Sequence, residues 1–212
     1  WSVYLVTGES LSAGRSTREI VERTIDGGVG VVQLREKDRT VRERYEMGRE
    51  IRELCREAGV TFVVNDRVDL AQALDADGVH LGDDDLPVPV ARELLGDDAV
   101  IGRSVSTVAA AKTAANAGAD YLGVGTVYRT QSKDDIPEDE HGVGPDRVAA
   151  IADAVDIPLV GIGGITAENA DEVARAGAAG VAVITAITRA EDPQGATAAL
   201  SEAVADGKRE RS

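Results

Sequence analysis

Short apolar runs rich in β-branched residues alternate along the chain with segments whose apolar residues recur every three or four positions. The short runs predict strands buried on both faces, and the periodic segments predict amphipathic helices. The expected strands are Val3–Thr7, Val29–Arg35, Thr61–Asn65, Gly78–Leu81, Val100–Ser104, Tyr121–Gly125, Pro158–Ile162 and Gly180–Ile184. The expected helices are Ser16–Asp26, Thr40–Ala58, Arg67–Leu74, Val88–Leu95, Thr107–Ala117, Gly144–Ala154, Ala167–Ala176 and Pro193–Ala205.

This strict alternation is typical of the (β/α)8 barrel, an α/β fold. Several helices are expected to end in an Ala-Gly pair, where glycine can adopt the left-handed conformation that closes a helix; the pairs are Ala58-Gly59, Ala117-Gly118 and Ala176-Gly177. We therefore expect residues 1–212 to form a single (β/α)8 TIM barrel. An open, doubly wound sheet is the alternative, because alternation alone does not show that the first and last strands pair.

One connection is much longer than the others. Residues 126–143 join the sixth expected strand to the following helix, and their second half carries the acidic segment Asp134–His141. A connection of this length inside a compact domain usually has a function. It follows the carboxyl end of a strand, which is where parallel α/β proteins bind ligands. We therefore expect residues 126–143 to form an active-site lid.

The net charge of the chain limits the classes of molecule that it is expected to bind. The net charge of −15 arises from 38 acidic and 23 basic residues. Nucleic acid and anionic membranes are therefore not expected partners, because both bind basic surfaces. An acidic surface with only four lysines is typical of proteins from a high-salt cytoplasm, where salt screens the repulsion between carboxylates. Aromatic residues make up only 3% of the chain, so the core must consist of Val, Ile, Leu and Ala.

Other features indicate a cytoplasmic protein. No apolar run reaches the ~20 residues that a membrane-spanning helix needs, and no segment resembles a signal peptide. The lone Cys55 excludes an intramolecular disulfide and a cysteine-based zinc site. Its position in a helical pattern favours a buried apolar role. A homo-oligomer is compatible with all of these features.

Scarce lysines follow two of the expected strands. Lys37 comes after the apolar run Val29–Leu34, and Lys133 ends the polar segment Tyr128–Lys133. An ammonium group is a compact charge suited to phosphate groups, and the carboxyl ends of barrel strands meet at one end of the fold. The pair therefore indicates a site for a multiply charged phosphate ligand, although each lysine alone would also fit a solvated loop.

Further polar side chains stand at the ends of the second and fifth strands. Gln33, Arg35 and Lys37 alternate along the chain and are expected to share one face, which suits an anionic substrate that also forms hydrogen bonds. Ser104 ends the fifth strand, where its hydroxyl can donate to a phosphate oxygen. His80 lies within an apolar strand, which favours a hydrogen-bonded core residue over a catalyst.

Acidic residues follow the third and fourth strands. Asp66 directly follows the strand that ends at Asn65, and Asp83, Asp84 and Asp85 follow Gly82. Adjacent parallel strands lie ~4.8 Å apart. Asp66 and one carboxylate of the trio could therefore share a hard cation such as Mg²⁺, with water and a phosphate completing its coordination. In so acidic a chain the trio would also fit a solvated loop, and Asp66 is the better candidate.

A glycine-rich segment and the last strand end form a third group. Gly161–Ile165 precedes the seventh helix, and Val183–Ala186 ends the eighth strand. In many barrels these positions bind phosphate through backbone N–H groups and helix N-termini. Glycine has no side chain, so an anion can approach the backbone closely. A structural tight turn is the alternative interpretation. The chain contains no Ser-His-Asp set, P-loop or dinucleotide-binding motif.

Segments from nearly the whole chain resemble the thiamine-phosphate synthase family. In order they are VQLREKD, VNDRVDLA, ADGVHLGDDD, IGRSVST, GADYLGVGTVYRTQSKDD, IPLVGIGGIT and AGAAGVAVITAI. Their combination is specific, although single pieces are not. The resemblance implies a transferase that joins 4-amino-2-methyl-5-(diphosphooxymethyl)pyrimidine to a thiazole phosphate and releases pyrophosphate.

The resemblance also implies the residues of the site. The pyrimidine pyrophosphate would be held by Gln33, Arg35, Lys37, Asn65, Ser104 and Lys133, with Ser104 and Lys133 acting in catalysis. The cofactor Mg²⁺ would be bound by Asp66 and Asp85. The thiazole phosphate would be held by Thr130, Gln131, Ser132, Gly164, Ile184 and Thr185. Ser132 and Thr185 stand where the family often has threonine and serine, and both keep the hydroxyl group.

The residue types favour a dissociative displacement. The chain shows no plausible nucleophile and no obvious general base, yet it places cations and a metal site toward a pyrophosphate. Lys133 and Mg²⁺ would stabilise the departing pyrophosphate, and the thiazole nitrogen would attack the carbocation that the aminopyrimidine stabilises. Two rival functions stay open: a thiazole tautomerase-like isomerase, which needs no metal, and a non-catalytic barrel that binds a phosphorylated metabolite.

Overall fold

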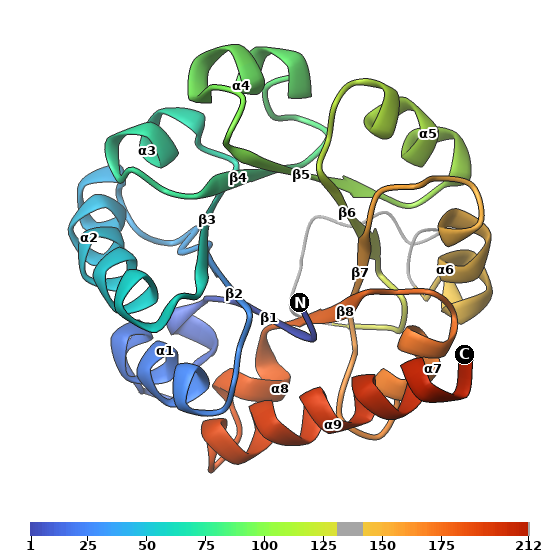
Figure 1. The fold of residues 1–212 in the computed structure, drawn as a ribbon. Coiled ribbons are helices and arrows are strands. Elements are labelled where there is room, and N and C mark those ends of the chain that lie inside the picture. Colours follow the sequence, from blue (N-terminus) through green and yellow to red (C-terminus); the bar gives the residue numbers. More distant parts are fainter. Residues whose placement is uncertain (131–141, 212) are drawn as a thin grey trace.

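Parallel strand pairing runs unbroken around the molecule. The computed structural model describes residues 1–130 and 142–211, and within these ranges eight strands pair in chain order and close into a barrel (Figure 1). The strands are β1 (Val3–Val6), β2 (Val31–Leu34), β3 (Thr61–Asn65), β4 (Gly78–Leu81), β5 (Val100–Val105), β6 (Tyr121–Gly125), β7 (Leu159–Ile162) and β8 (Gly180–Val183). The pairing of β1 with β8 confirms the (β/α)8 barrel and excludes the open sheet.

Helices surround the barrel as an outer ring, which Figure 1 shows along the barrel axis. The helices that follow the strands are α1 (Thr17–Asp26), α2 (Val41–Ala58), α3 (Val68–Ala73), α4 (Val88–Leu95), α5 (Val108–Asn116), α6 (Gly144–Ala152), α7 (Ala170–Arg175) and α9 (Pro193–Arg211). The expected glycine caps are present: Gly59, Gly118 and Gly177 all have positive φ. Among the described residues, no helix combines the length and the apolar composition that a membrane crossing requires.

Besides shifts of element ends by one to three residues, as in β2 and α7, the structure differs from the expected elements in three places. A 3-10 turn, η1 (Glu9–Leu11), and a short helix, α8 (Thr185–Thr188), were not predicted, because elements this short show no periodicity. Helix α9 continues past Ala205 to Arg211 through a polar last turn. Tertiary packing stabilises that turn: Arg175 of α7 pairs with Glu210 at 2.6 Å, and Gly207 lies directly against the backbone of α7.

The described residues form two hydrophobic cores. The larger one fills the layer between the strands and the helices, and each large apolar side chain buried there stabilises the fold by about 1.5–3 kcal/mol. The smaller one fills the inside of the barrel with Tyr4, Val6, Val31, Val63, Tyr121, Val160, Ala182 and Ile184. Successive strand residues supply the two cores alternately, because strand side chains point to opposite faces.

Trp1 lies at the amino-terminal end of the barrel, where Figure 1 marks the start of the chain inside the ring of strands. Its ring packs edge-on against the rings of Tyr121, at a centroid distance of 5.2 Å, and Tyr4, at 6.3 Å. It also lies against Gly30 and Gly180, which begin or precede strands. The aromatic cluster fills this end of the barrel and leaves the carboxyl ends of the strands for the site.

Candidate active site

A cavity of about 480 Å³ lies at the carboxyl ends of the strands. Its walls are formed largely by polar and charged side chains of the strand ends and the loops that follow them. The predicted site residues that line it are Gln33, Arg35, Lys37, Asn65, Asp66, Asp85 and Ser104. Residues from four separate strand ends therefore meet in one place, as the barrel geometry requires.

The other predicted site residues do not line this cavity or are not described. Gly164 follows β7, and Ile184 and Thr185 follow β8, outside the lining residues. Thr130 lies in the long connection and is the last residue described before residues 131–141. Gln131, Ser132 and Lys133 lie outside the described residues, together with residues 134–141 of the predicted lid.

The two ends of the long connection are joined at its base. The carbonyl oxygen of Thr126 accepts hydrogen bonds from the N–H groups of Gly142, at 3.1 Å, and Val143, at 2.9 Å. The carbonyl oxygen of Val127 accepts from Gly144 at 3.0 Å. Thr126 also lines the cavity, so the base of the connection lies at the cavity wall. The role of residues 126–143 as a lid stays a prediction.

Asp66 and Asp85 face each other at the cavity wall. Burial, the charge of Asp85 and a hydrogen bond with it together raise the pKa of Asp66 to about 6, against the lowering effects of Lys37 and Arg35. Asp66 has a φ of 64°, a left-handed conformation that is uncommon for residues other than glycine. A carboxylate pair held in this way favours a proton or a cation between its members.

Different partners distinguish Asp85 from Asp83. Oδ2 of Asp85 accepts from the N–H of Gly82 at 2.6 Å, which holds the side chain toward Asp66. Asp83 pairs instead with Arg103 at 2.5 Å and is exposed. The choice of Asp85 as the partner of Asp66 therefore agrees with the geometry, while its role in metal binding stays a prediction.

Arg35 and Lys37 reach the cavity from a loop. Strand β2 ends at Leu34, so the alternation that predicts a shared face for Gln33, Arg35 and Lys37 does not extend along a strand. All three nevertheless line the cavity. The N–H of Arg35 donates to Oγ1 of Thr7 at 3.0 Å, which fixes the start of this loop against the end of β1.

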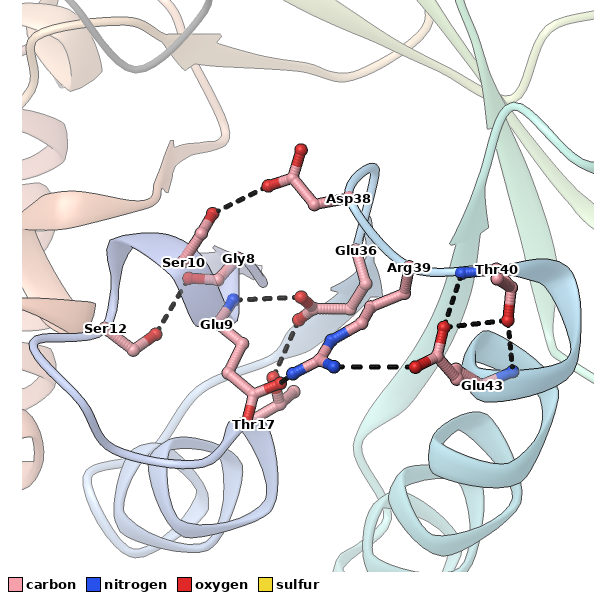
Figure 2. Close-up of polar contacts among 10 residues, drawn as sticks. All are labelled: Gly8, Glu9, Ser10, Ser12, Thr17, Glu36, Asp38, Arg39, Thr40 and Glu43. Carbon is pink, nitrogen blue, oxygen red and sulfur yellow. Dashed lines mark hydrogen bonds and ion pairs between the residues drawn. The ribbon is translucent and has the colours of Figure 1, made fainter.

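A clamp of side chains joins the loop after β2 to the loop after β1 (Figure 2). Glu36 is only 4% exposed, and its carboxylate accepts from the N–H of Glu9 at 2.9 Å and from Oγ1 of Thr17 at 2.7 Å. Arg39 pairs with Glu9 at 2.5 Å, and Ser10 donates to Asp38 at 2.9 Å. Because Glu36 stands between Arg35 and Lys37 in sequence, the clamp holds both cations at the cavity.

Gly163 and Gly164 form a tight turn after β7. Their φ values are +102° and +63°, and a Cβ atom on Gly164 would lie 2.6 Å from the carbonyl oxygen of Arg129 and 2.8 Å from Cβ of Tyr128. A side chain here would disturb packing whatever ligand binds nearby. The turn thus has a structural reason for its glycines, and binding of a phosphate here stays a prediction.

Comparison with known proteins identifies the family. The family profile described as "Thiamine monophosphate synthase" matches residues 3–187. The chain is 72% identical over 208 residues to the thiamine-phosphate synthase of Haloarcula marismortui, covering 98% of this chain and 99% of that protein. The chain belongs to the thiamine monophosphate synthase family.

More distant members and a solved structure agree. The thiamine-phosphate synthase of Moorella thermoacetica is 48% identical over 204 residues and 96% of each chain. The thiamine phosphate pyrophosphorylase structure from Pyrococcus furiosus superposes with a TM-score of 0.88 at 40% identity, covering 98% of this chain and 96% of that one. The resemblance noted in the sequence is thus confirmed, and with it the prediction that this thiamine monophosphate synthase family member is a transferase of the TIM-barrel fold.

A polar chain crosses the barrel of this thiamine monophosphate synthase family member at the wall of the cavity, which Gln33, Tyr4, His80 and Ser104 line. Gln33 Nε2 donates to the Tyr4 hydroxyl at 2.7 Å, and the hydroxyls of Tyr4 and Tyr121 are 2.8 Å apart. The Tyr121 hydroxyl lies 2.9 Å from Nδ1 of His80, whose Nε2 lies 2.9 Å from Oγ of Ser104. We call Gln33, Tyr4, Tyr121, His80 and Ser104 the polar chain.

Sequence reasoning missed part of the polar chain. His80 is hydrogen-bonded through both ring nitrogens, as expected, but it lines the cavity and is not wholly within the core. Tyr4 and Tyr121 were not recognised as part of the site. Their signal was available: they are two of only four tyrosines in an aromatic-poor chain, and both lie in apolar strands. A buried tyrosine hydroxyl needs a polar partner.

Proposed function

We propose that the chain joins 4-amino-2-methyl-5-(diphosphooxymethyl)pyrimidine to a thiazole phosphate, giving thiamine phosphate and pyrophosphate. The observation that carries this proposal is the meeting of a carboxylate pair with two cationic side chains and several hydrogen-bonding groups in one cavity. Such a mixture suits a pyrophosphate bound together with a divalent cation, because the carboxylates can bind the cation and the cationic side chains can bind the pyrophosphate. The names of the matched relatives support the same reaction.

Mg²⁺ would be held by Asp66 and Asp85. The described residues contain no cluster of three or more His, Cys, Asp or Glu side chains suited to a metal. The remaining ligands would therefore be water and pyrophosphate oxygens, and such sparse protein ligation is typical of Mg²⁺. The mutual repulsion of the two carboxylates favours a cation at this point. When bound, the ion supplies positive charge to the leaving pyrophosphate.

The protein's own side chains bind and orient the pyrimidine pyrophosphate. Arg35 and Lys37 neutralise its charge from the clamped loop, and Asn65 and Ser104 donate hydrogen bonds from the ends of β3 and β5. Gln33 meets the pyrimidine end of the substrate from β2. Holding the reactants in place lowers the entropy cost of the displacement. Lys133, proposed from the sequence, would meet charge that develops as the C–O bond breaks.

The thiazole phosphate would bind at the ends of β6, β7 and β8. Its proposed contacts are Thr130, Gln131, Ser132, Gly164, Ile184 and Thr185. Gly164 and Thr185 follow neighbouring strands, so backbone groups from both can approach one monophosphate. Residues 126–143 would close over both substrates and exclude water from the reactive carbocation.

We also place the protein in the cytoplasm, acting on small phosphorylated substrates without nucleic acid or membrane. Burial raises the pKa of the Cys55 thiol to about 12, so this thiol stays protonated and unreactive. The acidic surface supports the absence of a polyanionic partner.

The direct test is a product assay. The purified chain is incubated with both substrates and Mg²⁺, and thiamine phosphate and pyrophosphate are measured together. We expect equimolar formation of the two products, no reaction without the thiazole phosphate beyond slow hydrolysis, and loss of activity in EDTA that Mg²⁺ restores. A tautomerase would instead convert a thiazole phosphate isomer without consuming the pyrimidine substrate, and a passive binder would form neither product.

A further inference from the structure

The polar chain can carry its hydrogens in only two ways. Tyr4 and Tyr121 are each 1% exposed, and among residues 1–130 and 142–211 their hydroxyls have each other, Gln33 and His80 as partners. Burial raises the pKa of both phenols, so each keeps its single hydrogen. If Tyr4 donates to Tyr121, then Tyr121 must donate onward to His80; if Tyr121 donates to Tyr4, then His80 must donate to Tyr121.

The placement of the Gln33 amide, with its NH₂ group toward Tyr4, selects one of these directions. The amide NH₂ of Gln33 donates to Tyr4, so the hydrogen of Tyr4 must point to Tyr121, and that of Tyr121 to Nδ1 of His80. The neutral imidazole then carries its hydrogen on Nε2 and donates it to Ser104. At the two ends, the carbonyl oxygen of Gln33 and the hydroxyl hydrogen of Ser104 are left for a ligand in the cavity.

The opposite direction would exchange both ends at once. Gln33 would accept from Tyr4 and present its NH₂ group, while the hydroxyl hydrogen of Ser104 would point to His80. Ser104 would then offer only lone pairs, which repel an anionic oxygen. The same tyrosine, imidazole and serine positions thus serve two sets of hydrogen bonds once the Gln33 amide turns over, and no single bond can reverse alone.

We propose that the polar chain is a specificity device that couples Gln33 to Ser104 across the barrel. It selects a ligand that donates an N–H group to Gln33 and presents an anionic oxygen to Ser104, such as an amino-substituted heterocycle bearing a phosphate group. Tyr4, Tyr121 and His80 act as positioning residues that need not touch the ligand. The identity of the ligand rests on the proposed function, whereas the coupling itself does not.

The coupling is tested without substrate, by ¹⁵N NMR of the imidazole nitrogens at a pH where histidine is neutral. The chain has only two histidines, and His141→Gln identifies the signals of His80. In the wild type we expect the hydrogen of His80 on Nε2. In Gln33→Glu the carboxylate can only accept, so the chain must reverse and the hydrogen must move to Nδ1.

Two double variants show whether the hydroxyls transmit the change. In Gln33→Glu/Tyr121→Phe the link to His80 is cut, so the hydrogen should stay on Nε2. Gln33→Glu/Tyr4→Phe cuts the polar chain at Tyr4, and here too the hydrogen should stay on Nε2. Either double variant therefore tests the coupling if the other fails to fold. The inference is overturned if wild-type His80 is protonated on Nδ1, if Gln33→Glu leaves it on Nε2 or doubly protonated, or if the move persists in both double variants.

The specificity is tested by competition between two pyrimidine pyrophosphates that differ in one group, 4-amino or 4-oxo. The wild type should bind the amino compound at least about tenfold more tightly, because a mismatched buried hydrogen-bonding group is costly. Tyr121→Phe lets the amide of Gln33 turn freely and should reduce this preference about tenfold, whereas Tyr45→Phe on the exposed face of α2 should not. An unchanged preference in Tyr121→Phe would contradict the device, even if the condensation itself is confirmed.

Discussion

At the scale of single residues, neighbouring carboxylates have different surroundings and should have different effects. Asp85 is held toward Asp66 by the N–H of Gly82, whereas Asp83 pairs with Arg103. We expect Asp85→Asn to lower kcat about 100-fold at limiting Mg²⁺ and Asp83→Asn to lower it less than about threefold. Steady-state rates over a Mg²⁺ titration measure both. Equal sensitivity at the two positions would show that the metal ligand is assigned wrongly.

Asp66 should affect the free energy of unfolding as well as the activity. Its pKa rises from 3.8 to about 6 in the folded protein, so the folded state holds this proton more tightly than the unfolded chain. In the absence of metal, the free energy of unfolding should therefore fall as the pH rises from about 4 to about 6, and the loss should persist above that range.

The matched variant for this effect is Asp66→Asn, since asparagine also tolerates a positive φ. Without metal it should raise the free energy of unfolding at pH 7 by about 1 kcal/mol, a value reduced for solvent screening of a partly exposed group. It should also flatten the pH dependence between about pH 4 and 6. Urea unfolding in EDTA measures both. A variant less stable than the wild type at pH 7 would contradict the repulsion between Asp66 and Asp85.

Lys133 carries the sharpest prediction on catalysis, and it rests on the sequence alone. Its ammonium group is proposed to meet charge that is larger in the transition state than in the bound substrate, so its loss should appear mainly in kcat. Lys133→Ala should lower kcat about 10²–10³-fold while the KM for thiazole phosphate changes little. Lys133→Arg should recover only part, because a planar guanidinium places its charge differently. Near wild-type turnover by Lys133→Ala would rule out this role.

At the scale of elements, the clamp between the loops after β1 and β2 decides where two cations lie. Both oxygens of Glu36 are used in the clamp, so Glu36→Gln replaces one acceptor with an NH₂ group facing a donor. We expect the KM for the pyrimidine pyrophosphate to rise about tenfold, because Arg35 and Lys37 are held less firmly. The KM for the thiazole phosphate should stay nearly constant.

The control for the clamp is Glu53→Gln on the exposed surface of α2, where Glu53 pairs with Arg56 of the same helix. It removes the same charge without touching either loop, and exposed pairs of this kind contribute little. Steady-state kinetics with each substrate varied in turn compare the two variants. If both raise the KM for the pyrimidine substrate equally, net charge and not the clamp would be responsible.

At the scale of the whole molecule, the net charge of −15 should make stability depend on salt. Raising KCl from 0.1 M to about 1 M shortens the screening length from about 10 Å to about 3 Å and weakens repulsion between surface carboxylates. The free energy of unfolding should increase with KCl at pH 7. The increase should shrink near pH 4.5, the isoelectric point, where little net charge is left. Stability that falls with KCl at pH 7 would contradict the high-salt interpretation.

The sequence by itself determined the class of fold and predicted several of the residues that line the cavity. Strands buried on both faces leave continuous apolar runs, and helices leave a three-to-four periodicity, so both can be recognised locally. The carboxyl ends of parallel strands meet at one end of a barrel, so Arg35, Asp66 and Ser104 could be assigned to one cavity before their positions were known. Local patterns could not show η1 or α8, which are too short to have a period.

Only the tertiary structure decided closure and the interior of the barrel. Closure depends on the pairing of β1 with β8, whose strands lie at opposite ends of the chain. Tyr4 and Tyr121 are 117 positions apart, and their hydroxyls meet because both side chains point inward across the barrel. Asp85 stands apart from Asp83 because of one backbone N–H and one arginine. Distances across a closed sheet depend on which strands pair, and no local pattern of residue types contains that information.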